Sequence, residues 1–162
     1  MLTTSFKLLR EAGACKDRYG HLRRAMGSGF GDTKSIAITA VLELNGLDDA
    51  LWALRTVPEE QASERDLLSR TFACRSVRET PLADGRRVWD LLDDERSRGA
   101  VVAAEDFVAG KISAKDLASA RAAARAAAWA SARAAARAAA RASAWDAARA
   151  AQKIIFMEVF GS

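Results

Sequence analysis

The chain has 162 residues, half of them hydrophobic, with 10 glycines, 2 prolines and a formal net charge of +4. This length suits one domain with its own core, and the composition is too apolar for a disordered chain. The scarcity of proline, of glycine and of β-branched runs excludes an all-β protein. We therefore predict an all-α fold without a sheet, in a single domain of residues 1–162.

The basic excess lies in the C-terminal third of the chain. Residues 113–162 contain eight Lys/Arg and three Asp/Glu, whereas residues 1–112 contain seventeen and eighteen. Such asymmetry can indicate a nucleic-acid partner. Solvated arginines that keep an alanine-rich helix soluble are the simpler interpretation, and we prefer it.

The first third of the chain predicts two short helices and a loop. Residues 3–12 form an amphipathic pattern, and residues 16–26 form a second one that a central glycine weakens. The glycine-rich segment 27–35 is the loop that follows. It resembles a phosphate-binding loop because it ends in Lys34 and a serine, but Thr33 stands where that motif needs glycine and no strand precedes it. We therefore reject phosphate binding at this loop.

The next segment predicts two helices in direct succession. IAITAVLELNG is typical of a helix that ends at Asn45 and Gly46. In DDALWALRTV we expect Asp48 to be the N-cap of the following helix. Leu47 and Trp52 then have the spacing of a hydrophobic staple. Because capping explains the two adjacent aspartates, we do not interpret them as catalytic carboxylates.

The middle of the chain also predicts helices. EEQASERDLLSRTFACRSVRET has apolar residues at helical spacing, and Pro81 and Gly85 mark a loop. RRVWDLLDDERSRG follows with an apolar side, and AVVAAEDFVAG predicts a short helix that ends at Gly110. Ser113 and Asp116 have the spacing of a capping box, with aspartate in place of the usual glutamate.

Residues 113–160 predict a long helical spine, rich in alanine and arginine, on which the short helices of residues 1–112 pack. The segment contains no glycine or proline before Phe160, and we expect one helix of at least 30 residues in it. Its large residues recur every four positions, so each step advances about 40° around the helix. The stripe therefore winds around the helix, which suits neither a coiled coil nor a linear row of DNA contacts.

The chain offers little material for catalysis. His21 is its only histidine, and the two cysteines, Cys15 and Cys74, match no metal or redox spacing. We expect the cysteines to be reduced and partly buried, and His21 to be a surface or partly buried structural residue. We therefore expect no catalytic residue, no cofactor and no metal, and a protein that is not an enzyme. Because no signal peptide and no apolar run of about 18 residues occurs, we expect a cytoplasmic location without membrane contact.

Several stretches resemble a family of small alanine-rich helical proteins. They include NGLDDALWALRTVPEE, ERDLLSRTFAC and VVAAEDFVAGKISAKDLASARAAARAAAWA, and the likeness extends from KLLREAGACKDRY to QKIIFMEVFG. Members are common in phages, prophages and bacterial genomes, and some are described as immunity proteins of polymorphic toxin systems. The chain departs from its relatives at FACRSVRE, where they often have FACDCAER; Arg75 replaces an acid and Ser76 a second cysteine. This departure argues against a metal or disulfide role there.

The resemblance implies an α-helical protein that acts by binding another protein. We expect an inhibitor of a host or bacterial protein: an immunity protein against a toxin, or a phage counter-defence protein such as an anti-CRISPR. A homodimer is compatible with the same surface chemistry. The alternative is a nucleic-acid-associated protein that uses the basic third. The candidate partner-binding residues are Arg125, Arg133, Arg137, Arg141 and Arg149.

Overall fold

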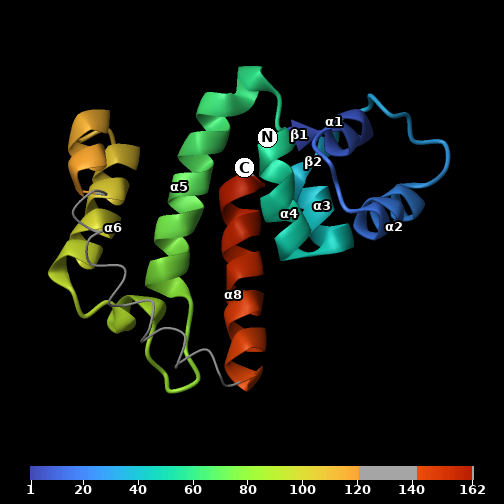
Figure 1. Cartoon of the computed structure of the whole chain (residues 1–162). Coiled ribbons are helices and arrows are strands. Elements are labelled where there is room, and N and C mark those ends of the chain that lie inside the picture. Colours follow the sequence, from blue (N-terminus) through green and yellow to red (C-terminus); the bar gives the residue numbers. More distant parts are fainter. Residues whose placement is uncertain (121–141, 162) are drawn as a thin grey trace. The chain divides into compact units, whose positions relative to one another are not determined.

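The computed structural model describes residues 1–120 and 142–161 (Figure 1). Helices dominate these residues, so the all-α class is confirmed. The chain divides into two compact units: unit 1 comprises Met1–Leu68 and Phe156–Ser162, and unit 2 comprises Ser69–Ile155. This division differs from the expected internal boundary between residues 112 and 113. The single domain stays a prediction.

Unit 1 begins with a small sheet, so the prediction that the protein has no sheet is wrong. β1 (Thr3–Thr4) pairs antiparallel with β2 (Ile36–Ala37). Threonine and isoleucine favour extended backbone because both are branched at Cβ. α1 (Phe6–Glu11) therefore starts three residues later than predicted, after Ser5, whose Oγ accepts a hydrogen bond from the backbone N–H of Leu8 at 3.3 Å.

The second helix and its loop follow the sequence pattern closely. α2 spans Lys16–Met26, the predicted bounds, and residues 27–35 form no regular element. The loop is tied back to unit 1 by Asp32, which accepts from Arg10 at 2.9 Å and forms an ion pair with Arg23 at 2.5 Å. The Phe30 ring also packs edge-on against the ring of Phe6, 5.8 Å between centroids.

The turn between α3 (Ile38–Asn45) and α4 (Leu47–Ala53) corrects one prediction. Gly46 is the only residue between the two helices, and its φ of +89° is a conformation that glycine adopts readily. Gly46 is the N-cap, so α4 begins two residues earlier than an N-cap at Asp48 would place it, with Leu47 inside the helix and 3% exposed. The assignment of Asp48 as N-cap is therefore wrong, as is the staple with Trp52. A 3-10 turn, η1 (Leu54–Thr56), completes this segment.

The end of α8 (Ala142–Phe160) contributes aromatic rings to the core of unit 1. Phe156 and Phe160 stack with their centroids 4.3 Å apart, and both side chains are almost fully buried. Figure 1 shows this end of α8 beside α3 and α4. The buried hydrophobic residues of unit 1 are Leu2, Phe6, Leu9, Leu22, Ile36, Ile38, Val41, Leu42, Leu47, Ala50, Ala53, Leu54, Val57, Phe156, Val159 and Phe160.

Unit 2 differs from the expected helix pattern near its middle. After the short turn η2 (Glu59–Gln61) of unit 1, α5 spans Ala62–Glu79, and its residues from Ser69 on belong to unit 2. A turn then leads to η3 (Val88–Leu91). α6 spans Glu95–Val108, so it begins about five residues before the predicted helix and passes through Gly99. The reason is Asp94, the N-cap, whose carboxylate accepts from the backbone N–H of Arg96 at 2.8 Å.

The capping box at Ser113 is confirmed. Ser113 N–H donates to the Asp116 carboxylate at 3.1 Å, Asp116 N–H donates to Ser113 Oγ at 3.3 Å, and residues 114–120 are helical. The expected helix of at least 30 residues, and its role as a spine, depend on residues 121–141, which lie outside the described residues. Within the described ranges, none of the helices has the length and apolar character needed to cross a membrane.

Candidate functional site

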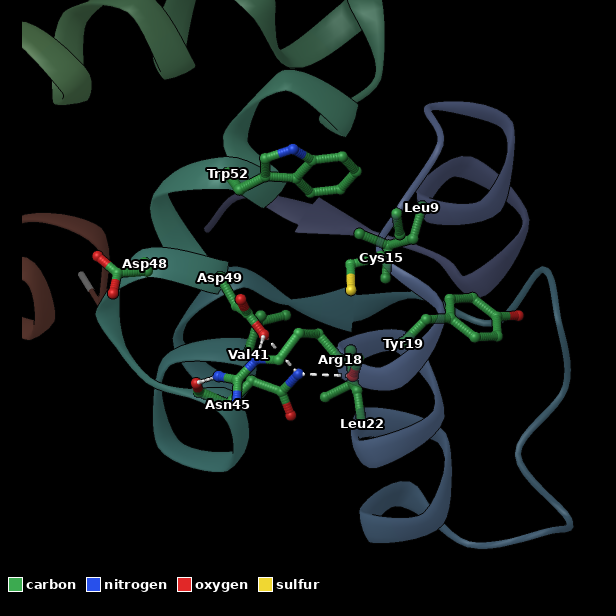
Figure 2. A pocket seen from close by; sticks show the side chains of 11 residues that line it. Leu9, Cys15, Arg18, Tyr19, Leu22, Val41, Asn45, Asp48, Asp49 and Trp52 are labelled. Atoms are coloured by element: carbon green, nitrogen blue, oxygen red, sulfur yellow. Dashed lines mark hydrogen bonds and ion pairs between the residues drawn. The ribbon is translucent and has the colours of Figure 1, made fainter.

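A cavity of about 230 Å³ lies in unit 1 among α1, α2, α3 and α4 (Figure 2). It opens to solvent, because the side chain of Arg18 in its wall is 51% exposed and Cys15 is exposed. The lining is mainly apolar, with a few polar groups. The lining residues are Leu9, Ala14, Cys15, Arg18, Tyr19, Leu22, Val41, Asn45, Asp48, Asp49 and Trp52.

Asn45 is the centre of a hydrogen-bond network in the cavity wall. The residue is only 8% exposed, and its Nδ2 donates to the carbonyl of Arg18 at 2.9 Å and to Asp49 Oδ2 at 2.7 Å. Its Oδ1 lies 2.8 Å from Nδ1 of His21. One amide therefore joins α2, α3 and α4, and both ends of the buried group have partners.

Arg18 closes the same network from the surface. Its Nε donates to Asp49 Oδ2 at 2.8 Å, and its Nη2 donates to the main-chain carbonyl of Asn45. This carbonyl is one of the unpaired acceptors at the C-terminus of α3, so the guanidinium also caps that helix. The charges of Arg18 and Asp49 consequently offset each other within the wall.

The opposite wall is aromatic and apolar. In Figure 2 the Trp52 ring lies on the far side of the cavity from Arg18, with Cys15 and Leu9 beside it. The guanidinium of Arg55 lies 5.0 Å from the centroid of the Trp52 ring, and Arg55 Nε donates to the Trp52 carbonyl at 3.2 Å. Leu51, the residue before Trp52 on α4, is 37% exposed.

Expectations from the sequence concern three single residues, His21, Cys15 and Cys74. His21 is exposed, as expected, but it has a specific partner in Asn45. Cys74 is buried, whereas Cys15 is exposed, so the expectation of partial burial is wrong for Cys15. Cys15 is a cavity-lining residue because α2 starts directly after it. Within residues 1–120 and 142–161, no three His, Cys, Asp or Glu side chains come together as metal ligands.

Unit 2 contains a second, more polar cavity of about 240 Å³. Arg78 of α5 makes a two-pronged ion pair with Glu105 of α6, both N···O distances being 2.8 Å. Its guanidinium also lies 3.5 Å from the centroid of the Trp89 ring. The hydrogen bond with Glu105 raises the pKa of Arg78 and lowers that of Glu105. These contacts of Arg78 hold α5, η3 and α6 together, so we assign them to the stability of the fold.

The five predicted partner-binding arginines are not assembled into a site by the described residues. Arg149 lies in α8 and is half-buried. The other four, Arg125, Arg133, Arg137 and Arg141, lie outside the described residues.

Asn45 is not among the predicted site residues, although one signal in the sequence points to it. Ile38, Val41 and Leu42 occupy the buried face of α3, and Asn45 continues their spacing at the seventh position. A polar residue in this place must find hydrogen-bond partners inside the fold. The pattern could predict that partners exist, but not that they come from α2.

Comparisons with known proteins add no assignment. No family model matches the chain, and no curated protein and no solved structure matches it either.

Proposed function

We propose that the protein is a non-enzymatic binder of another protein, and that unit 1 carries the contact surface. The observation that supports this most is the group Leu51, Trp52 and Arg55, here called the α4 surface. Tryptophan and arginine are the residue types that most often dominate protein interfaces. Here an arginine already lies over the tryptophan ring, beside an exposed leucine and the opening of a cavity.

The bonds of the cavity wall support binding rather than catalysis. A catalytic base or nucleophile needs a reacting group within hydrogen-bond reach and free to move a proton. Asp49 instead accepts hydrogen bonds from Arg18 and Asn45, and Nδ1 of His21 is engaged by Asn45. These residues join three helices, so they form a scaffold for the surface beside them.

The resemblance of the sequence supports a more specific proposal. We infer a cytoplasmic inhibitor, either an immunity protein that blocks a toxin or a phage counter-defence protein that blocks a component of a defence system. A small helical chain that acts by occupying a partner's surface needs no cofactor. A homodimer remains compatible with this role.

The test is affinity capture from a nuclease-treated host lysate with two matched variants. Leu51→Asp places a charge on the α4 surface, whereas Leu67→Asp makes the same change at a leucine of unit 1 that is 43% exposed. We expect the first variant to lose the captured partner and the second to keep it, with circular dichroism showing both folded. Equal capture by both variants would contradict the proposal.

The nucleic-acid alternative has its own test. We expect binding to random duplex DNA, measured by fluorescence anisotropy at several salt concentrations, to stay in the non-specific range of roughly 10⁻⁴ to 10⁻⁶ M at physiological salt. Submicromolar affinity that disappears when Arg133, Arg137 and Arg141 are changed to glutamate would favour the alternative.

A further inference from the structure

The size of the unit 1 cavity limits what can enter it. Sites for drug-sized ligands and cofactors usually have volumes of about 300–1,000 Å³. The cavity measures about 230 Å³, and an apolar cavity of about 150 Å³ is large enough to hold benzene. One ring-sized group therefore fits, whereas a nucleotide or a larger cofactor does not.

The charges of the wall limit the occupant further. Arg18 and Asp49 are joined at 2.8 Å, and Asn45 uses its amide within the same network. A charged occupant would lose water and find its natural partners already paired, which costs free energy. Asp48, the other charged lining residue, is exposed and lies at the edge of the cavity away from Cys15 and Tyr19 (Figure 2). The wall thus matches a neutral group.

The shape of the apolar wall favours an aromatic group. Trp52 lines the cavity from α4, and the buried side chains of Leu22 and Val41 complete its apolar lining (Figure 2). Tyr19 of α2 also lines it, but its ring packs edge-on against Phe6 at 5.4 Å and points away from Trp52. Aromatic rings gain free energy from offset or edge-on contact with other rings, beyond the area that they bury. The Trp52 ring can make such a contact with the ring of an occupant.

We propose that this cavity receives one neutral aromatic side chain of the partner protein, inserted beside the α4 surface. The inference rests on the proposed protein-binding function and names the chemistry of the contact. Its occupant is a phenylalanine-like side chain, and the cavity discriminates against the charged analogues of that ring.

The first test uses small probes and the full chain. N-acetyl-phenylalaninamide is titrated against N-acetyl-leucinamide, benzylammonium and phenylacetate, with the NMR resonances of Trp52 and Val41 as the readout. We expect saturable binding of the neutral aromatic probe and binding at least about threefold weaker for the other probes. Absence of saturable binding in the folded protein, or equal or tighter binding of a charged probe, would overturn the inference.

Two matched variants connect the cavity to the partner. Cys15→Phe fills the opening from an exposed lining position, and Ala25→Phe adds the same ring to an exposed position of α2 outside the lining. We expect the first variant to lose probe binding and to weaken partner binding about thirtyfold, the effect of a hot-spot residue. We expect the second variant to change neither.

A third measurement needs no substitution. The Cys15 thiol of the native chain is equilibrated with benzyl, isobutyl and aminoethyl disulfides, and we expect the benzyl adduct to dominate. No preference for it would count against an aromatic occupant even if Cys15→Phe failed to fold. If the probes fail while Leu51→Asp still loses the partner, the inference is wrong and the proposed function stands. If neither Leu51→Asp nor Cys15→Phe affects capture, both are wrong.

Discussion

The two units of this chain are stabilised in different ways. Among the described residues, sixteen of the twenty buried hydrophobic residues belong to unit 1 and four to unit 2. In unit 2 the contacts between α5 and α6 include the Arg78–Glu105 ion pair and Arg70 over the Phe107 ring at 5.2 Å. We therefore expect unit 1 to be destabilised most by substitutions that remove side-chain volume. We expect the described part of unit 2 to be destabilised most by substitutions that remove charge.

The two units also differ in charge. Unit 1 contains nine Lys/Arg and eleven Asp/Glu, a net of −2, whereas unit 2 contains sixteen and ten, a net of +6. The cavity and the α4 surface belong to unit 1, and the arginine-rich segment belongs to unit 2. The two candidate functions therefore rely on different units, so that substitutions can separate them.

The largest effect is expected from Phe6→Ala in unit 1. Phe6 is fully buried, and its ring meets the ring of Tyr19 edge-on at 5.4 Å and lies under Arg23 at 4.5 Å. Removing such a ring costs about 3–5 kcal/mol of unfolding free energy, because a cavity remains. Urea denaturation measures this loss, and a loss below about 1 kcal/mol would show that the core is not what stabilises unit 1.

A smaller loss is expected from Asn45→Ala. The substitution takes a hydrogen-bond partner from the Arg18 carbonyl, from Asp49 Oδ2 and from Nδ1 of His21, and leaving a buried polar group unsatisfied costs about 1–3 kcal/mol. His21→Ala takes the partner from Oδ1 of Asn45, but His21 is exposed and water can take its place, so we expect it to cost under about 1 kcal/mol. Equal losses for the two variants, in the same denaturation experiment, would contradict the central place of Asn45.

Two arginines of unit 2, Arg75 and Arg78, allow a matched test of charge, because their side chains are equally exposed, 34% each. Arg78 joins two helices and a tryptophan ring, whereas the Arg75 pair with Glu79 lies within α5. We expect Arg78→Ala to cost about 1 kcal/mol and Arg75→Ala about 0.3–0.5 kcal/mol. Raising the salt concentration should reduce both losses. Salt-independent losses would indicate that packing, rather than charge, holds unit 2.

The smallest expected effect is a loss of stability at acidic pH. The hydrogen bond from the Arg96 side chain, helped by the Arg96 backbone N–H, lowers the pKa of Asp94 to about 2. Because the folded-state pKa lies below the ordinary value, Asp94 stabilises the fold at pH values above about 4. This contribution is lost as the pH falls toward 2.

Thermal melts between pH 2 and pH 5 test whether this stability is lost as the pH falls. Asp94→Asn keeps an acceptor for the helix cap but removes the charge. We expect the melting temperatures of the native chain and the variant to converge as the pH falls to 2. A difference that persists unchanged at pH 2 would contradict the assignment.

The sequence predicted what depends on neighbouring residues. The bounds of α2, the end of α3 at Asn45 and the Ser113–Asp116 capping box all follow from side chains within one or two turns. The early start of α6 could also have been found, because Asp94 is a strong N-cap residue two positions before Arg96. α6 runs through Gly99 because one glycine costs a helix only about 1 kcal/mol.

The sequence could not predict the contacts that join residues far apart in the chain. Asp48 and Asp49 are equivalent as capping candidates, and only the fold shows that Asp49 pairs with Arg18, 31 positions away in the chain. The same is true of the cavity, whose lining comes from four helices. Hydrophobic periodicity predicts which face of a helix is buried, but not which side chains meet there.

The most direct test of the account places both candidate surfaces in one experiment. Partner retention from a nuclease-treated lysate is quantified for the native chain, for Leu51→Asp in unit 1, and for the triple change of Arg133, Arg137 and Arg141 to glutamate in unit 2. We predict that Leu51→Asp loses the partner while the triple variant keeps it, with both variants folded. Loss of the partner in the triple variant, with Leu51→Asp unaffected, would contradict the claim that unit 1 carries the binding surface.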